Sequence, residues 1–181
     1  MRLLDAESSV LVLVDYQSRL MPVIHDGSTV LAQALHLANI ARDLGVTTIG
    51  TEQNPDGLGR NLVDIRARCA FTLAKRHFDA CADGLLDAIS THAPARPRDV
   101  VIAGCEAHVC LLQTAMGLLD AGRRVWVAAP ACGSRDPTSH ALAMQRLQTA
   151  GASIVNTEMM AFEWLRSCDH PKFRQVLQRL K

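Results

Sequence analysis

The sequence predicts a three-layer α/β/α fold with a six-stranded, mostly parallel sheet. Short apolar runs rich in β-branched residues alternate with longer stretches whose apolar residues recur at helical spacing. The order β-α-β-loop-β-α-β-α-β-α-β-α places helices on both faces of a parallel sheet. The chain has 181 residues, of which 49% are hydrophobic and 20% charged, so it can bury a sizeable core. We therefore expect a single domain over residues 1–181.

Six apolar runs have the length and composition of strands. The first, Val10–Val14, is continuous and ends at Asp15, as expected of a central strand buried on both faces. Five more are expected at about 46–50, 71–75, 99–103, 123–129 and 152–156. Asp15, Lys75 and Cys110 each follow one of these strands. Because the carboxyl ends of parallel strands share the edge where open α/β sheets bind ligands, we expect the three side chains to converge there.

Helical periodicity covers most of the sequence between the strands. Helices are expected at 29–44, 81–93, 137–150 and 158–166, with another that begins near Cys110 and ends at Gly122. A last helix over 169–181 is expected to begin with Pro171 in its first turn, and it carries an apolar stripe. We expect this stripe to pack on the body of the domain or on a neighbouring subunit.

Cys110 is the residue on which the functional prediction depends. It is expected in the first turn of a helix, where free backbone N–H groups and the helix dipole lower the pKa of a thiol. The same N–H groups can hold a developing oxyanion. A lone cysteine is more often a small buried hydrophobe. The catalytic interpretation therefore depends on Asp15, which can take the thiol proton, and on Lys75, which can stabilise the charges.

Bulk properties argue against several classes of partner. The net charge of +1 and the small number of aromatic residues (two Trp, one Tyr, four Phe) argue against nucleic acid. No apolar run is long enough to span a membrane, and Asp5 and Glu7 precede the first apolar run, unlike a signal peptide. We therefore expect a cytoplasmic protein with reduced cysteines, no membrane partner and no cofactor. The turn after the first strand lacks G-x-G-x-x-G, and no zinc spacing is present.

Several motifs together resemble those of the isochorismatase-like cysteine hydrolases, whose fold is the one predicted above. The motifs are Leu13–Gln17, Lys75, Gly104–Cys110 with Thr114, and Gly133–Arg135. The resemblance runs from about Val10 to Thr157 and keeps the family's order of elements. Two more stretches, Thr51–Gly59 and Asp169–Arg174, resemble the isochorismatase-domain-containing subgroup, in which substrates are poorly defined.

The resemblance implies a role for each matching residue. Cys110 matches the nucleophile, Asp15 the base and Lys75 the third member of a triad. A non-proline cis peptide bond is implied between Cys105 and Glu106, and it would turn the Glu106 N–H toward the site, beside the Cys110 N–H, as an oxyanion hole. No metal is expected, because residues 51–54 lack the histidine of metal-binding nicotinamidases. Pro130 stands where the family often has aspartate.

The function that follows from the resemblance is hydrolysis of a small carbonyl compound, an amide or related C–N bond, through a thioester-type intermediate. Two alternatives stay open: a hydrolysis of the isochorismatase type that needs no cysteine, and a non-catalytic interaction or regulatory protein on this fold. A redox role for Cys105 and Cys110 lacks the C-x-x-C spacing. The family usually forms oligomers, so we expect a homo-oligomer. The residues expected to bind substrate are Tyr16, Gln17, Glu52 and Gln53.

Overall fold

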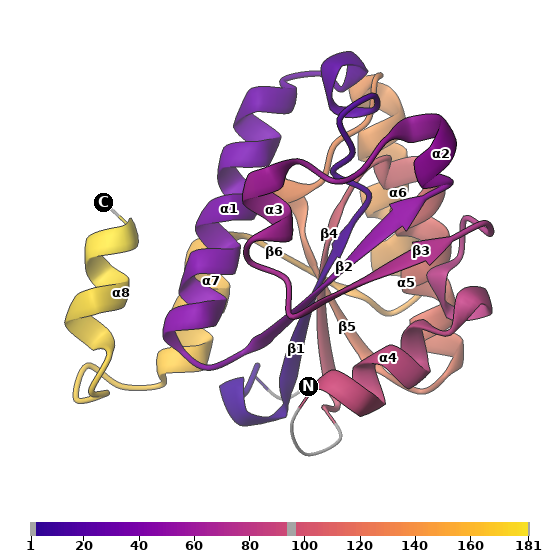
Figure 1. The fold of residues 1–181 in the computed structure, drawn as a ribbon. Coiled ribbons are helices and arrows are strands. Elements are labelled where there is room, and N and C mark those ends of the chain that lie inside the picture. The colour runs from indigo at the N-terminus through magenta and orange to yellow at the C-terminus, as the bar shows by residue number, and fades with distance from the viewer. Residues whose placement is uncertain (1–2, 94–96, 181) are drawn as a thin grey trace.

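A computed structural model describes residues 3–93 and 97–180, with a parallel six-stranded sheet at its centre (Figure 1). The strands are β1 (Ser9–Val14), β2 (Thr47–Gln53), β3 (Phe71–Lys75), β4 (Asp99–Gly104), β5 (Arg124–Ala128) and β6 (Ser153–Val155). Their order across the sheet is β3-β2-β1-β4-β5-β6, and every neighbouring pair is parallel. The predicted fold class is confirmed.

The order of strands reverses between β1 and β4, which creates the crevice where ligands bind in open α/β sheets. Both strands are buried along their whole length, as their continuous apolar sequences require. The register pairs Val14 with Gly104 at the carboxyl ends. On the other side of β1, it pairs Gln53 of β2 with Lys75 of β3. These register positions determine which side chains meet at the ligand edge.

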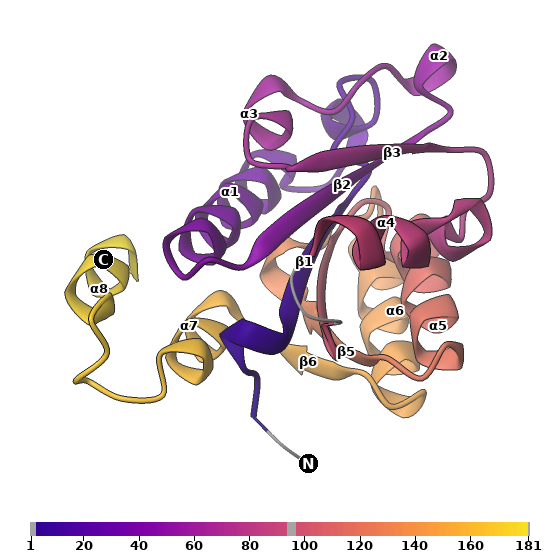
Figure 2. The same ribbon diagram turned by 60° about the horizontal axis from the view of Figure 1, so that its bottom comes forward.

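Helices cover both faces of the sheet (Figure 2). They are α1 (Gly27–Asp43), α2 (Pro55–Leu58), α3 (Val63–Arg66), α4 (Leu85–His92), α5 (Leu112–Asp120), α6 (Pro137–Thr149), α7 (Thr157–Leu165) and α8 (Phe173–Leu180). One face carries α1 and α7, and the other carries α4, α5 and α6. None of these helices of the described chain has the length and apolarity needed to cross a membrane.

The tail helix α8 lies against α1 and α7 of its own chain. Val176 is buried there, and Arg179 forms an ion pair with Asp43 of α1. The helix begins at Phe173 rather than at 169, so the expectation that Pro171 lies in its first turn is wrong. Residues before Phe173 form turns instead, because the His170 ring accepts the Lys172 N–H and the His170 carbonyl accepts the Phe173 N–H.

Two other elements differ from their predicted extent. The segment predicted as one helix over 81–93 is divided at Gly84, whose φ of 96° is left-handed and interrupts an α-helix. β2 continues to Gln53, three residues beyond its predicted end. The residues 51–53, which lie beyond the predicted end of this strand, are therefore strand residues whose side chains point alternately to opposite faces.

Candidate active site

Asp15 and Lys75 form a buried ion pair at the carboxyl ends of β1 and β3. Asp15 Oδ2 lies 2.8 Å from Lys75 Nζ, and both side chains are 0% exposed. The Thr51 hydroxyl donates to the other carboxylate oxygen, Oδ1, at 2.7 Å. Within the described residues, Oδ2 accepts no hydrogen bond besides its ion-pair contact. Asp15 also has a φ of 55°, an uncommon conformation for a non-glycine residue that concentrates at functional sites.

Cys110 lies beside this pair. It belongs to a turn of π-helix, Ala107–Leu111, that connects β4 to α5. Its side chain is buried, and Sγ lies 3.9 Å from Oε1 of Gln53, the oxygen that also accepts a hydrogen bond from Lys75 at 2.7 Å. The structure therefore brings Asp15, Lys75 and Cys110 together, at the edge of the sheet where the sequence places them.

The thiol of Cys110 is a weaker acid than the sequence analysis expected. Burial, and after it the negative charge of Asp15, raise its pKa to about 12, although Lys75 acts in the opposite direction. The expectation of a lowered pKa is wrong, because desolvation of the thiolate and the charge of Asp15 outweigh the effect of Lys75. Cys110 is accordingly a neutral thiol at rest, and a base must remove its proton.

The main chain near Cys110 has an unusual conformation. The peptide bond between Cys105 and Glu106 is cis, and the N–H of the next residue, Ala107, donates to the Gly133 carbonyl at 2.7 Å. Within the described residues, the Glu106 N–H donates to no protein acceptor. Gly104 precedes this segment, and a Cβ there would lie 2.2 Å from the Val14 carbonyl oxygen. Glycine is therefore required where β4 passes β1.

The carboxylate of Glu106 is held by Arg135. The Arg135 backbone N–H donates to Oε2 at 2.9 Å, and its guanidinium donates to both oxygens, at 3.1 and 2.7 Å. Burial favours a higher pKa for Glu106, but the hydrogen bonds and charge of Arg135 lower the pKa below its usual value. Sequence analysis gave Arg135 no role beyond its motif. The contact links two loops far apart in sequence, which local patterns do not reveal.

The structure does not bring all four expected binding residues to the thiol. Tyr16 is fully buried, and its hydroxyl donates to the Ala131 carbonyl at 2.5 Å. Glu52 lies on the opposite face of β2 from Gln53 and accepts the Asn61 N–H at 2.9 Å. Gln17 binds the backbone of Gln53. Of the four, Gln53 contacts the ion pair and the thiol.

Thr51, the partner of Asp15, lies two residues before Gln53 and on the same face of β2. The role of Thr51 was not predicted from the sequence, because the strand was expected to end at residue 50. The alternation of side chains along a strand would have paired Thr51 with Gln53, had β2 been predicted at its full length.

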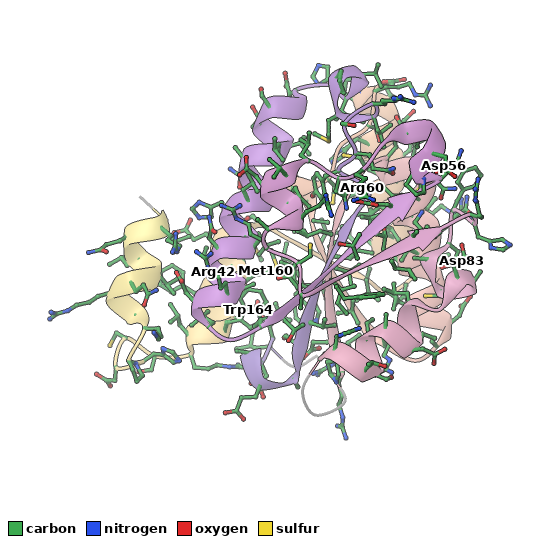
Figure 3. All side chains as sticks on the ribbon, viewed as in Figure 1. Arg42, Asp56, Arg60, Asp83, Met160 and Trp164 are labelled. Atoms are coloured by element: carbon green, nitrogen blue, oxygen red, sulfur yellow. The ribbon has the colours of Figure 1, made fainter. Side chains whose placement is uncertain are left out.

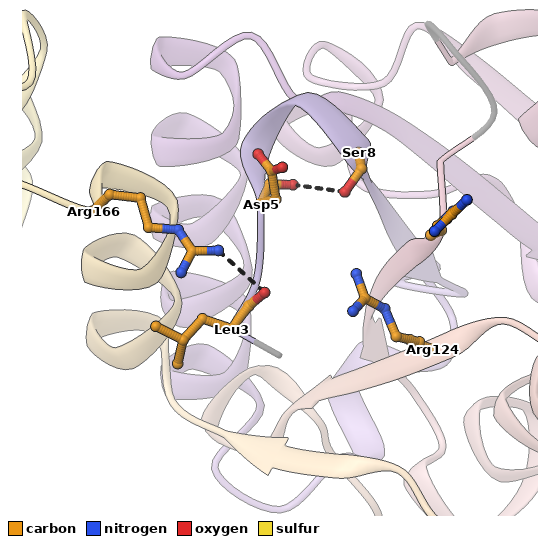
Figure 4. Close-up of a pocket in the computed structure, with 6 residues that line it drawn as sticks. Leu3, Asp5, Ser8, Arg124 and Arg166 are labelled. Carbon is orange, nitrogen blue, oxygen red and sulfur yellow. Dashed lines mark hydrogen bonds between the residues drawn. The ribbon is translucent and has the colours of Figure 1, made fainter. Parts of the chain in front are cut away.

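A depression at the other end of the sheet is distinct from this site (Figure 4). It is lined by Leu3, Asp5, Ser8, Arg98, Arg124 and Arg166. Arg124 there donates to Asp99 at 2.6 Å, and Arg166 donates to the Leu3 carbonyl at 3.2 Å, so both guanidinium groups already have protein partners. Over the described residues, no group of three or more His, Cys, Asp or Glu side chains is arranged to hold a metal ion.

The parallel α/β/α fold and the polar cluster at the carboxyl ends of its strands are compatible with the isochorismatase family, and comparison with known proteins places the chain in that family. The model of the isochorismatase domain matches residues 9–159. Isochorismatase domain-containing protein 2 of Bos taurus is 32% identical over 176 residues, which cover 96% of this chain and 83% of the relative. The chain therefore belongs to the isochorismatase family, and the predicted resemblance, including the subgroup, is confirmed.

Solved structures agree with this assignment. MAR1 ribonuclease from Caenorhabditis elegans has a TM-score of 0.91 and 30% identity, with 99% of this chain and 92% of the other covered. YcaC from Escherichia coli, described as an octameric hydrolase of unknown specificity, has a TM-score of 0.85 and 22% identity, with coverage of 98% and 96%. The second likeness concerns the fold alone.

Proposed function

We propose that this protein is a cysteine hydrolase that cleaves a small amide or related C–N bond through an acyl-thioester on Cys110. The observation that carries the proposal concerns one carboxylate oxygen of the buried pair, Asp15 Oδ2. Asp15 Oδ2 lies 2.8 Å from Lys75 Nζ, accepts no hydrogen bond from a described residue and lies beside a thiol whose pKa is about 12. A buried carboxylate with a free lone pair next to a neutral thiol is suited to general-base catalysis.

The first half-reaction forms the thioester. The thiol proton moves to Asp15 Oδ2 as the Cys110 sulfur bonds to the carbonyl carbon, and the C=O π electrons move to oxygen. The Glu106 and Cys110 N–H groups hold that oxyanion. When the oxyanion collapses, the C–N bond breaks, and the amine leaves with the proton that Asp15 carries. Lys75 balances the negative charge of the thiolate and then of the carboxylate.

The second half-reaction hydrolyses the thioester. Asp15, again ionised, takes a proton from a water molecule whose oxygen bonds to the acyl carbon. The C–S bond then breaks, the acid leaves and the sulfur regains a proton from Asp15. Each turnover consumes one water and releases one amine and one carboxylic acid, and the enzyme returns to its starting protonation state.

Two fold neighbours have names that bear on the proposed chemistry, one through a covalent ligand and one through amide substrates. YcaC from Pseudomonas aeruginosa, with 24% identity and a TM-score of 0.88, has been solved with covalent acrylamide, a reagent that bonds to nucleophiles through its alkene. A pyrazinamidase/nicotinamidase from Streptococcus mutans, with 21% identity and a TM-score of 0.68, is named for amide substrates. Both likenesses show the fold alone, and so the reaction of the present chain rests on its own residues.

A panel of small primary and N-carbamoyl amides, assayed by ammonia release, tests the proposal. We expect turnover by the wild type, loss of turnover in Cys110→Ala, and unchanged turnover in Cys168→Ala, which removes an exposed free cysteine. Turnover that survives Cys110→Ala would favour the cysteine-independent alternative. Absence of turnover on every compound would favour the non-catalytic alternative. RNA is tested separately, with shorter fragments on a gel as the readout, because one relative is named a ribonuclease.

We further propose that the chain is a single-domain homo-oligomer in a reducing, cytoplasmic compartment. All six cysteines lie among the described residues and are free, as expected of reduced thiols. The relative from Escherichia coli is octameric. Light scattering coupled to gel filtration would test the oligomer directly, and a monomeric mass at micromolar concentration would contradict it.

A further inference from the structure

Gln53 has its side-chain amide in a fixed orientation. Its Nε2 donates to the Arg76 carbonyl at 2.7 Å, so its Oε1 must face the opposite direction, toward Lys75. That oxygen accepts from Lys75 Nζ at 2.7 Å and lies 3.9 Å from Cys110 Sγ. One neutral oxygen therefore contacts both the ammonium and the thiol.

Gln17 in turn fixes the backbone of Gln53. The side chain of Gln17 donates to the Gln53 carbonyl at 2.9 Å and accepts the Gln53 N–H at 2.8 Å. This pattern replaces the strand neighbour that Gln53 lacks on that side, because β1 ends at Val14. Gln17 is fully buried, and its amide also donates to the Gly59 carbonyl. At the end of β2, a side chain thus provides the hydrogen bonds that β1 provides farther back along the strand.

Lys75 has acceptors of two kinds around its ammonium. Asp15 Oδ2 lies on one side at 2.8 Å, and Gln53 Oε1 lies on another at 2.7 Å. The carbonyls of His77 and Phe78 are longer contacts, both at 3.4 Å. Without the Gln53 oxygen, the carboxylate and the two carbonyls would determine the position of the ammonium, and no short contact would hold it near the sulfur.

We propose that Gln17 and Gln53 are positioning residues that together hold the Lys75 ammonium between Asp15 and Cys110. The inference rests on the proposed function, which gives Lys75 its charge-balancing role, and it assigns to the two glutamines a task other than substrate binding. Gln53 acts through Lys75, and Gln17 acts through the backbone of Gln53.

The test is the rate of iodoacetamide labelling of Cys110 as a function of pH, with each cysteine resolved by peptide mass. In Gln53→Met, which keeps the length of the side chain but removes its oxygen, the ammonium relaxes away from the sulfur. We expect Cys110 to label about 3–10-fold more slowly at a fixed pH, which corresponds to an upward shift of about half to one unit in apparent pKa. Cys168, exposed on the surface, is the internal reference.

The same substitution made in a Lys75→Met protein shows whether Gln53 acts through Lys75. If Gln53 acts through Lys75, the slowing caused by Gln53→Met disappears when Lys75 is already Met, as a double-mutant cycle detects. Equal slowing in both backgrounds, or no slowing in either, would overturn the proposal. Gln145→Met, on the exposed side of α6, is the matched control and should label like the wild type.

Two more variants keep the test decisive if Gln53→Met does not fold, as judged by thermal melting. Gln53→Asn keeps a buried amide but withdraws its oxygen by one methylene, and it should slow labelling in the same way. Gln17→Met should also slow the labelling of Cys110, but by a smaller factor than Gln53→Met. Labelling needs no substrate, so a response of this kind in a protein without amide turnover would leave the positioning role standing and refute the hydrolase alone.

Discussion

Asp15 and Lys75 face each other at 2.8 Å without any exposure of either side chain to solvent. Removing one partner of such a pair leaves a buried charge without compensation. We expect Lys75→Met to lower the free energy of unfolding by about 3–5 kcal/mol, measured by urea denaturation. Arg76→Met is the matched control, because the Arg76–Asp56 pair at 3.3 Å is largely exposed and should contribute about 0–1 kcal/mol. If both variants lost a similar amount of unfolding free energy, the result would contradict the expectation that the buried pair is much more sensitive than the exposed one.

The pKa of Cys110 predicts the pH dependence of its chemistry. With a pKa of about 12, the thiolate fraction rises tenfold per pH unit throughout the range from pH 7 to pH 10. Labelling of Cys110 should therefore still be accelerating at pH 10. Because Asp15 raises this pKa and Lys75 lowers it, Asp15→Asn should label faster than the wild type and Lys75→Met more slowly. A labelling rate that reaches a plateau below pH 9 would refute the conclusion that burial raises the pKa of Cys110.

Asp83 stabilises the turn that leaves β3, where Figure 3 shows its side chain. It accepts hydrogen bonds from the His77 ring and from the His77 and Arg76 N–H groups, and these bonds lower its pKa from 3.8 to about 2. A carboxylate with a depressed folded-state pKa stabilises the fold above the unfolded-state value, and the contribution is lost as pH falls through the folded-state value.

The variant Asp83→Asn should therefore melt at a lower temperature than the wild type between pH 5 and pH 7, with a difference that shrinks below about pH 4 and disappears only below about pH 2. Differential scanning calorimetry at several pH values measures the difference. Asp87→Asn, on the exposed side of α4, is the control and should show no such trend. A difference in melting temperature that stays constant down to pH 2 would contradict the lowered pKa of Asp83.

Arg135 orients Glu106 and, through it, the N–H proposed for the oxyanion hole. In Arg135→Met, the Glu106 carboxylate loses both guanidinium hydrogen bonds. We expect kcat on an amide substrate to fall by about 10–100-fold with little change in KM, since removing an oxyanion donor outright costs about 100–1000-fold. Arg66→Met, which alters the weak 4.0 Å pair with Glu52 on the other face of β2, should leave kcat unchanged. Equal effects of the two substitutions would exclude the orienting role.

The convergence of Asp15, Lys75 and Cys110 was predictable because it follows from topology. Each residue stands at or just after the carboxyl end of a strand, and parallel strands bring those ends to one edge. Apolar runs located all six strands, most clearly β1 and β4, because burial on both faces leaves continuous apolar sequences there. The edge strands β3 and β6 are less buried.

Other features depend on contacts that local patterns do not encode. The extension of β2 to Gln53 depends on Gln17, whose amide replaces a missing strand. The raised pKa of Cys110 depends on burial, which the helix-dipole argument ignored. The start of α8 at Phe173 depends on turns around His170, which compete with the helix that Pro171 would otherwise begin.

The central claim is that Cys110 carries the acyl group of the substrate. Its most direct test is acid quenching during turnover of an amide found in the panel, followed by intact-mass measurement and peptide mapping. The account predicts a mass increase equal to the acyl group on the peptide that contains Cys110, its release by hydroxylamine, and its absence in Cys110→Ala. Turnover at the wild-type rate by Cys110→Ala, with no adduct on any cysteine of the wild type, would contradict it.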